Sequence, residues 1–552
     1  MPADRFVSWA RGAALAATLA AAGCSNLTRP GASENPWTHH GRLVFAESLD
    51  TDSLNPMLAS SVPTIDVSMF VFSYAVRFDE RGRPVPDALR EIPTVENGDV
   101  SPDGLRLTYR LRTNLRWQDG VPVTCRDLKF TVAAVLNPHN NVVTTDGYRD
   151  IASIACPSPS VAVVHMKRVY APFLQQLWGV NGNAPIEPEH LLAKYNDDRG
   201  SFNHAPYQSL PIGSGPFRVT AWHRGDSVEM KAFDGFYAGR PKLDAVVFKY
   251  LPDENTMVDE VRTHEIDLAV HAGLSSWPAL QRIGGYTASA PAVFTFDHVD
   301  FNMRRPLFGA DRDLRRALAL AIDRPELLRK IAFGQGVLTD TALSPQLSAA
   351  YDRHARHYPF DPAAARALLE RDGWRVGPDG IRTKHGVRLA FTIGTQTEAT
   401  TDKALEVQIQ RFWHDVGAEA SVKNYNTAQF FANSDISVLH SGAYDVAIYP
   451  WSGSIDPDDS AIYSARNMPP HGQNFLFWND AAATAGMNRE LATIEPRERL
   501  RGFTEEQERF AEEVPSLVLW YRHEPQIASN DLRGYAPSAV ISPFWDPWNY
   551  SI

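Results

Sequence analysis

Apolar and polar residues alternate with a period of two along parts of the first half of the chain. The segment 105–112 (LRLTYRLR) places Leu and Tyr on one side and Arg and Thr on the other. This pattern predicts a β-strand with a buried apolar face and a basic face directed outward. The turn sequence SPDG at 101–104 precedes it. Segments 228–233 and 243–251 predict further strands, separated by Gly and Pro residues.

From about residue 311 the apolar residues recur at the spacing of an α-helix. Segment 311–321 (DRDLRRALALA) repeats Leu and Ala at this spacing, and its two initial acids favour the positive end of the helix dipole. Pro325 ends this helix and opens another, which Gly334 closes. Segment 361–373 begins with Asp-Pro and ends on Gly, as capped helices do, and 405–417 carries a third apolar stripe.

Strand patterns return at 444–449 and 516–521, so strands and helices alternate in the second half of the chain. This order predicts an α/β fold with mixed sheets, in which a β-rich first lobe precedes a helix-richer second lobe. The change in composition falls near residue 300. With 552 residues, of which 44% are hydrophobic, the chain is long enough for two or three domains.

The N-terminus predicts export from the cytoplasm. Arg5 and Arg11 precede an uncharged apolar run of 11 residues at 12–22. A membrane span needs about 20 apolar residues, so this run fits a secretory signal peptide instead. No later stretch reaches the length of a membrane span without charges.

The sequence AAGC at 21–24 resembles the lipobox of bacterial lipoproteins, in which the Cys thiol is acylated and becomes the first residue. This resemblance implies a signal peptide at 1–23, a lipid on Cys24 and a flexible membrane-anchored tether at 24–40. An ordinary signal peptide cut near Ala22 is the alternative. The expected location is the periplasm or the cell surface.

Without residues 1–23 the chain carries 52 Lys and Arg against 64 Asp and Glu, a net charge near −12. This balance argues against nucleic acid as a partner, because proteins that bind it present basic patches. After Cys24 only Cys125 and Cys156 remain. An oxidising compartment permits one disulfide between them, and two buried thiols are the alternative.

The chain shows no familiar catalytic or cofactor motif. The triplet GSG at 213–215 resembles part of a nucleophile elbow, but the flanking Pro residues favour a turn. The His pairs at 39–40 and 354/357 lack a third ligand nearby in the sequence. The acids at 456–459 lack the spacing of a calcium loop and predict a capped turn that opens a helix at Ser460. We therefore expect no enzymatic activity, no cofactor and no metal site.

Several segments, taken in order, resemble the bacterial extracellular solute-binding proteins of the oligopeptide, dipeptide and nickel type. The strongest is 101–130, where SPDG, the strand LTYRLR and the sequence RWQDGVPVT lead into a helix opened by an acid. Further similarities are IGSGPF at 212–217, FDGFYAGRPKL at 233–243, FNMRRP at 301–306 and the helix 358–374 that ends in Gly-Trp. The resemblance covers nearly the whole chain from Arg42 onward.

This resemblance implies a bilobed periplasmic-binding-protein fold. Lobe I would comprise 41–298, with an extra β-rich subdomain, and a C-terminal return at 523–552, and lobe II would comprise 299–522. Two crossing segments, near 297–302 and 519–523, would form the hinge. The implied function is that of the substrate-binding component of an ABC importer, a monomer that captures peptides between its lobes and delivers them to permease subunits.

In proteins of this type, an acid a few residues after a Trp binds the amine of the peptide. The corresponding stretch here is YPWSGSIDPD at 449–458. The usual acid falls on Ser454, so either Asp456 replaces it or the ligand has no amine there. Asp456 is alternatively the structural start of the next helix. Trp451 is expected to line the cleft, and a position in the core is the alternative.

Arg304 and Arg305 lie next to the first crossing segment and are candidates to bind a ligand carboxylate, with simple surface exposure as the alternative. Besides peptides, the same fold is compatible with a nickel chelate, an opine or a sugar derivative. A secreted hydrolase is the hypothesis from a different class. It would require a nucleophile and a base, and the sequence shows no such set.

Overall fold

The computed structural model describes residues 35–51, 53–59, 61–431, 436–470, 472–538, 540 and 542–552. The expected signal peptide, Cys24 and most of the tether lie outside these residues and stay predictions. The compact unit His39–Ile552 is described below. None of the helices in the described ranges combines the length and the apolar character that crossing a membrane requires.

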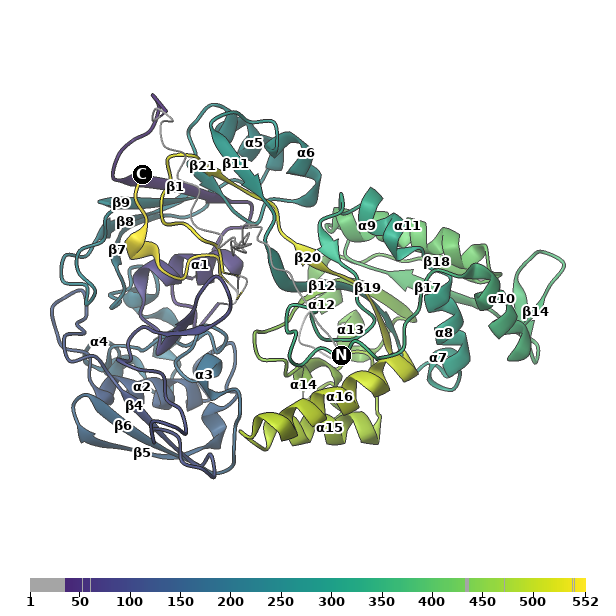
Figure 1. Cartoon of the computed structure of the whole chain (residues 1–552), viewed down its shortest axis with the longest axis horizontal. Helices are drawn as coiled ribbons and strands as arrows, with labels where there is room; N and C mark the ends of the chain where they lie inside the picture. Colours follow the sequence, from purple (N-terminus) through teal and green to yellow (C-terminus); the bar gives the residue numbers. More distant parts are fainter. Residues whose placement is uncertain are drawn as a thin grey trace, which may run out of the picture. The chain divides into compact units, whose positions relative to one another are not determined.

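A seven-stranded mixed sheet has the strand order β11-β21-β10-β1-β9-β8-β7 (Figure 1). β1 runs parallel to β9 and β10, whereas β21 is antiparallel to β10 and β11. All residues of β1 after the first are buried, as expected for a strand covered on both faces. The strands are β1 (Arg42–Glu47), β7 (Phe217–His223), β8 (Ser227–Ala232), β9 (Ala245–Tyr250), β10 (Leu268–Ala269), β11 (Tyr286–Ser289) and β21 (Gln526–Ser529).

A six-stranded mixed sheet has the order β13-β20-β12-β19-β17-β18. The neighbouring strands β12 and β20 are antiparallel and run side by side in Figure 1. The strands expected at 444–449 and 516–521 are confirmed as β19 and β20. The six strands are β12 (Ala292–Phe301), β13 (Gly336–Val337), β17 (Ala390–Gly394), β18 (Glu419–Val422), β19 (Val446–Ser452) and β20 (Ser516–His523).

Three small sheets complete the strands. They are β2 (Val76–Phe78) with β3 (Pro84–Pro86), β4 (Arg106–Arg110) with β5 (Ile151–Ser158) and β6 (Val161–Met166), and β14 (Arg375–Val376) with β15 (Arg382–Lys384) and β16 (Val387–Arg388). The expected strand at 105–112 is therefore β4. The prediction that the polar residues of this strand are exposed is wrong at Thr108, whose side chain is only 3% exposed. The segment of Asp99 covers this face, since Thr108 N donates to Asp99 O at 2.7 Å and Arg110 pairs with the Asp99 carboxylate.

Helices lie between the strands, and their ends follow the capping residues. Asp361 accepts from Ala364 N at 2.8 Å, so the expected N-cap is confirmed. Asp311, expected only to favour the helix dipole, is also an N-cap and accepts from Leu314 N at 2.9 Å. The first ten helices are α1 (Val62–Val71), α2 (Cys125–Leu136), α3 (Phe173–Gln176), α4 (Glu189–Leu192), α5 (Glu254–Arg262), α6 (Trp277–Leu280), α7 (Pro306–Gly309), α8 (Arg312–Leu320), α9 (Arg324–Lys330) and α10 (Pro362–Arg371). The others are α11 (Thr400–His414), α12 (Thr427–Phe431), α13 (Val438–Ser441), α14 (Ser460–Tyr463), α15 (Ala481–Leu491) and α16 (Pro496–Glu513). The predicted α/β class is confirmed.

The chain passes between the two large sheets twice. β11 belongs to the seven-stranded sheet and β12 to the six-stranded sheet, and β20 and β21 reverse this passage. The two passages touch each other, because Ala292 pairs with His523 and Glu524 N donates to Pro291 O at 3.0 Å. The assignment of lobe I to 41–298 and 523–552 and of lobe II to 299–522 stays a prediction.

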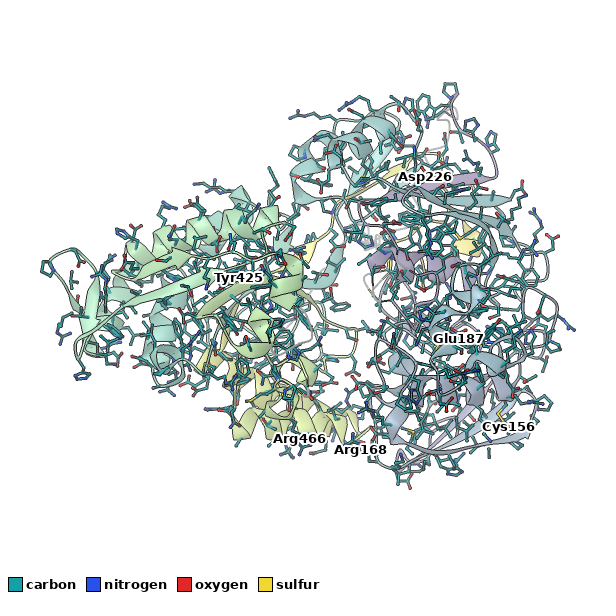
Figure 2. The ribbon with its side chains drawn as sticks, turned by 180° about the vertical axis from the view of Figure 1, so that it is seen from behind. Cys156, Arg168, Glu187, Asp226, Tyr425 and Arg466 are labelled. Carbon is teal, nitrogen blue, oxygen red and sulfur yellow. A yellow bond between two sulfur atoms is a disulfide. The ribbon has the colours of Figure 1, made fainter. Side chains whose placement is uncertain are left out.

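A disulfide joins Cys125, the first residue of α2, to Cys156 in β5 (Figure 2). The two residues are 31 positions apart in the sequence. Closing a loop of this length removes conformational freedom from the unfolded chain, which stabilises the fold by about 3–4 kcal/mol. The bond therefore fixes the helix against the small sheet that contains β4, β5 and β6.

Replacing both cysteines with alanine is expected to lower the free energy of unfolding of this region by about 3–4 kcal/mol. Thermal unfolding should begin at a lower temperature in the double variant than in the wild type. A thiol reductant should lower the unfolding temperature of the wild type and leave that of the variant unchanged. Equal unfolding temperatures without reductant would contradict the stabilising role.

Candidate functional site

Trp451 lies in β19, where it is paired across the sheet with Phe296 of β12. Its side chain is half-buried and packs against two apolar clusters of the core, one around Tyr463 and Phe510 and one around Tyr449. Trp451 thus contributes to the core, as the alternative assumed, while part of its surface stays accessible. Both of its expected roles are compatible with this position.

The segment that follows β19 contacts residues from the first half of the chain. Ser454 Oγ accepts a hydrogen bond from Asn181 Nδ2 at 2.6 Å. Ile455, next in sequence, packs against a small apolar cluster that contains Phe78, Phe294 and Val540. A neutral hydroxyl and an amide therefore meet at the position where proteins of this type usually have an acid. The stretch 451–458 lies at a junction of segments that are far apart in the sequence.

Asp456 has a protein partner of its own. Its Oδ1 accepts from Arg499 Nη2 at 2.6 Å and from Asp458 N at 3.1 Å. No hydrogen bond among the described residues uses Oδ2. Burial raises the pKa of Asp458 to about 6 and that of Asp459 to about 7. The helix expected at Ser460 is confirmed as α14, so the acids at 456–459 form a turn at its N-terminus.

Arg304 and Arg305 each already interact with a neighbouring side chain. The guanidinium of Arg304 lies over the ring of Phe477, 4.3 Å from its centroid. Arg305 Nε is 3.0 Å from an Asp445 carboxylate oxygen, and the Arg305 side chain is 41% exposed. No hydrogen bond or ion pair within the described ranges links either arginine to the stretch 451–458. The structure therefore does not assemble the five expected site residues into one set of contacts.

An ion pair between the half-buried Arg522 and a fully buried carboxylate lies near the end of β20. Arg522 makes two hydrogen bonds to the Asp297 carboxylate of β12, at 2.5 and 2.9 Å, and Asp297 is fully buried. Asp402 of α11 lies nearby. Burial raises its pKa to about 7, and the negative charge of Asp297 adds to this shift. Arg522 thus balances a carboxylate that the surrounding core would otherwise leave unpaired.

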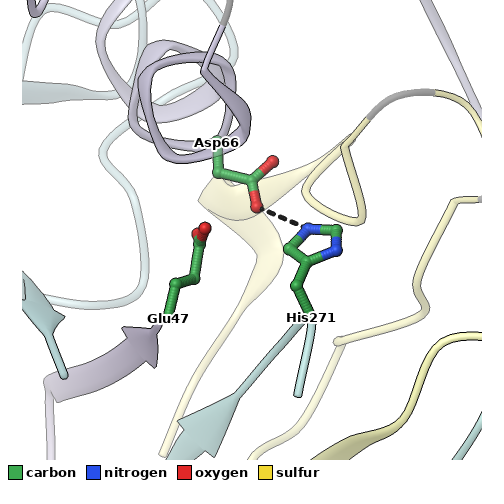
Figure 3. Close-up of side chains that lie close together, drawn as sticks. All are labelled: Glu47, Asp66 and His271. Atoms are coloured by element: carbon green, nitrogen blue, oxygen red, sulfur yellow. Dashed lines mark hydrogen bonds and ion pairs between the residues drawn. The ribbon is translucent and has the colours of Figure 1, made fainter. Parts of the chain in front are cut away.

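A second charged group lies beside the seven-stranded sheet and comes from four segments that are distant in the sequence; Figure 3 shows three of its members, Glu47, Asp66 and His271. His271 lies 3.0 Å from Asp66 and 2.7 Å from Glu524, and the Glu47 carboxylate faces the same point. Burial raises the pKa of Glu47 well above its usual value, and the charge of Asp66 adds to this effect. Burial lowers the pKa of His271, but the two neighbouring carboxylates outweigh it and raise the pKa overall.

The spacing of histidines along the chain does not indicate this group, because its members come from segments that are distant in the sequence. A usable signal was present. Asp66 is the one charged residue of the apolar helix 62–71 (VPTIDVSMFV), and Glu47 ends the apolar strand RLVFAE. A charged side chain inside an apolar element needs a partner from elsewhere in the fold.

A cavity of about 600 Å³ lies beside α7 and α8 and is lined in part by Met303, Arg312 and Asp480. Several of its charged side chains already have protein partners, some of which lie outside the lining. Arg312 pairs with Glu513 at 3.3 Å, and Arg509 pairs with Asp480 at 2.5 Å. None of the five expected site residues lines this cavity. The cavity is therefore separate from the candidate site.

Residues 54–471 match the family model described as bacterial extracellular solute-binding proteins, family 5. This match covers well over half of the chain. The chain belongs to this family. The family assignment confirms the resemblance that the sequence motifs indicated, and members of family 5 are extracellular, so the protein works outside the cytoplasm.

Relatives within family 5 are similar over most of their length. The glutathione-binding protein GsiB of Salmonella typhimurium is 26% identical over 444 residues, which cover 80% of this chain and 82% of GsiB. The oligopeptide-binding protein AppA of Bacillus subtilis is 21% identical over 501 residues, which cover 90% and 89%. These relatives are binding proteins by name.

Solved structures show that the fold is shared. The crystal structure of NikZ from Campylobacter jejuni in complex with Ni(L-His) superposes with a TM-score of 0.79 at 23% sequence identity. The match covers 93% of this chain and 99% of NikZ. The predicted periplasmic-binding-protein fold is thereby confirmed at the level of its architecture.

Proposed function

We propose that this protein is the substrate-binding component of an ABC importer and that its solute is a peptide. Membership of family 5 and the names of two relatives, a glutathione-binding and an oligopeptide-binding protein, support this function. The solute binds between a lobe I of residues 41–298 and 523–552 and a lobe II of residues 299–522. The bound form is then presented to the permease subunits.

The observation that carries the proposal is the junction made by the stretch 451–458. Ser454 bonds to Asn181, and Ile455 packs with Phe78, so this stretch of the second half meets the first half. A solute held here contacts both halves at once, which favours the closed form. Trp451 supplies an apolar wall, and Ser454 supplies a hydroxyl.

Asp456 is the proposed acceptor for the amine of the peptide. Arg499 and Asp458 N both bind Oδ1, and this arrangement orients the carboxylate with Oδ2 available to a ligand. A charge-assisted hydrogen bond to this oxygen is stronger than a neutral one. Arg304 and Arg305 are the proposed partners of the peptide carboxylate, for which Arg305 would exchange its contact with Asp445.

Replacing Asp456 with asparagine is expected to weaken peptide binding tenfold or more, because the charge that pairs with the amine is lost. Isothermal titration calorimetry with the peptide identified by mass spectrometry of the purified protein measures this change. Asp415→Asn is the matched control, since Asp415 is exposed and lies away from the 451–458 turn in sequence. Unchanged affinity in Asp456→Asn would remove this residue from the site.

A thermal-shift panel of peptides, nickel chelates, opines and sugars tests the class of solute. A ligand present at 100 times its dissociation constant adds about 2.7 kcal/mol to the free energy of unfolding. We expect peptides to raise the unfolding temperature and the other compounds to leave it unchanged. Stabilisation by a sugar or a chelate, with no effect of any peptide, would contradict the peptide assignment.

The proposed anchor is a lipid on Cys24, followed by the tether 24–40. A single acyl chain binds a membrane only marginally, so stable attachment requires the two or three chains of bacterial lipoproteins. A flexible tether of this length keeps the binding protein at a high local concentration near its permease. Mass spectrometry of the mature N-terminus tests the proposal. An unmodified N-terminus cut near Ala22 would contradict it.

A further inference from the structure

Four ionisable side chains from separate segments meet beside the seven-stranded sheet, and three of them, Glu47, Asp66 and His271, are drawn in Figure 3. Glu47 ends β1, Asp66 lies in α1, His271 follows β10, and Glu524 lies between β20 and β21. Glu47 is 1% exposed and Asp66 is fully buried. None of these four residues is part of the proposed solute site, so this group is a separate feature of the protein.

The ligand atoms of three of these residues are close enough to share one ion. One carboxylate oxygen from each of Glu47 and Asp66 and one ring nitrogen of His271 all lie within 4.8 Å of one another. The Nε2 atom of His271 is 3.0 Å from Asp66 Oδ2. These three atoms converge from a strand, a helix and a loop onto one point.

Glu524 fixes the orientation of the imidazole. Its carboxylate lies 2.7 Å from Nδ1 of His271, on the side of the ring opposite to Asp66. Nδ1–H donates to Glu524, and a metal ion bound to Nε2 would take the place of the proton that Nε2 shares with Asp66 Oδ2. Histidines that bind metals commonly donate their second ring N–H to a carboxylate in this way.

Two oxygens in the group have no partner. Oε1 of Glu47 and Oδ1 of Asp66 are buried, and neither has a hydrogen bond among the described residues. No Lys or Arg side chain in the described ranges forms an ion pair with either carboxylate. Asp66 pairs with His271 through its other oxygen, whereas Glu47 has no ion-pair partner among the described residues. Three buried or half-buried carboxylates around a single imidazole leave an excess of negative charge, so the folded protein favours a cation at this place.

We propose that Glu47, Asp66 and His271 form a binding site for a divalent transition metal ion such as Zn²⁺, Co²⁺ or Ni²⁺. The imidazole nitrogen selects these metals over Mg²⁺ and Ca²⁺, which prefer oxygen ligands. Two carboxylates balance the charge of the ion. Three protein ligands leave at least one coordination position for water or for another small ligand. Glu524 acts as a positioning residue through His271.

Titration of the purified full chain with Co²⁺, after removal of bound metal with a chelator, tests the site. We expect one equivalent to bind with a change in visible absorption, and Zn²⁺ to displace it. His271→Gln and Glu47→Gln should each weaken binding at least 100-fold. Glu524→Gln should weaken it 10- to 100-fold with the stoichiometry retained, as expected for a residue that orients a ligand. His357→Gln is the control, since His357 pairs with Asp340 at a more exposed position and should leave binding unchanged.

Either of two results would overturn the proposal. One is a wild-type protein that binds no Co²⁺, Zn²⁺ or Ni²⁺, and the other is unchanged binding in both His271→Gln and Glu47→Gln. If a variant fails to fold, anomalous scattering from wild-type crystals soaked with Zn²⁺ decides. A peak between the three ligand atoms supports the site, and a peak only elsewhere contradicts it.

Discussion

Replacing Arg522 with methionine is expected to lower the free energy of unfolding by about 3–5 kcal/mol, the typical effect of removing one partner of a buried ion pair. Arg522 makes two hydrogen bonds to Asp297, and Asp297 is fully buried between neighbouring strands. The variant would leave this carboxylate without its cation, close to Asp402. Chemical denaturation followed by tryptophan fluorescence measures the change.

The double variant Arg522→Met/Asp297→Leu tests whether the loss of stability comes from the unpaired buried charge or from the removal of the Arg522 side chain itself. Replacing both charges with apolar groups is expected to restore most of the loss, because no buried charge remains unpaired. Arg388→Met is the control, since Arg388 is 42% exposed and pairs with two surface acids, so its loss should amount to less than about 1 kcal/mol. Equal effects of Arg522→Met and Arg388→Met would contradict the role of the buried pair.

Replacing Glu187 with glutamine is expected to make the protein more stable at pH 8 by about 4 kcal/mol. The Glu187 side chain is fully buried, and burial raises its pKa from about 4.5 to about 8. Because the folded form holds the proton more tightly, wild-type stability is greatest below pH 4.5 as far as this group is concerned. It then falls as the pH rises toward 8. Glutamine carries no charge at any of these pH values, so the variant lacks this decrease.

Unfolding measured at pH 5 and at pH 8 tests this expectation. The loss of stability between these values should be smaller in Glu187→Gln than in the wild type. A residual loss is expected in the variant, because burial also raises the pKa of Asp402 and that of Glu406 to about 7. Glu96→Gln is the control, because Glu96 is exposed. An identical pH dependence in Glu187→Gln and the wild type would contradict the assigned cause.

The parts of the fold that depend on local sequence were predictable. The N-caps Asp311 and Asp361 bond to backbone N–H groups three residues away, so the sequence alone contains both partners. The strands β8, β9 and β20 have apolar runs bounded by turn residues, and their positions were correct to within two residues. The family resemblance rested on motifs of the same local kind.

Contacts between distant segments were not predictable from these patterns. Thr108 was expected on an exposed face, but the segment of Asp99 covers it. His271 is 205 positions from Asp66 and 253 from Glu524, and their contact depends on how β10, α1 and β21 are arranged. Asp456 followed the family pattern only approximately, and its pairing with Arg499 of α16 depends on how that helix lies against the turn.

The strand that completes the seven-stranded sheet is made last. β21 comprises residues 526–529 and lies between β10 and β11, which precede it in the chain by about 240 residues. At about 5–20 residues per second, a growing chain carries these two strands for roughly 10–50 s before the strand between them exists. Unpaired strand edges invite pairing with other chains. A product cut short before residue 526 keeps this gap permanently, so incomplete chains differ from full-length ones in a feature that chaperones and proteases detect.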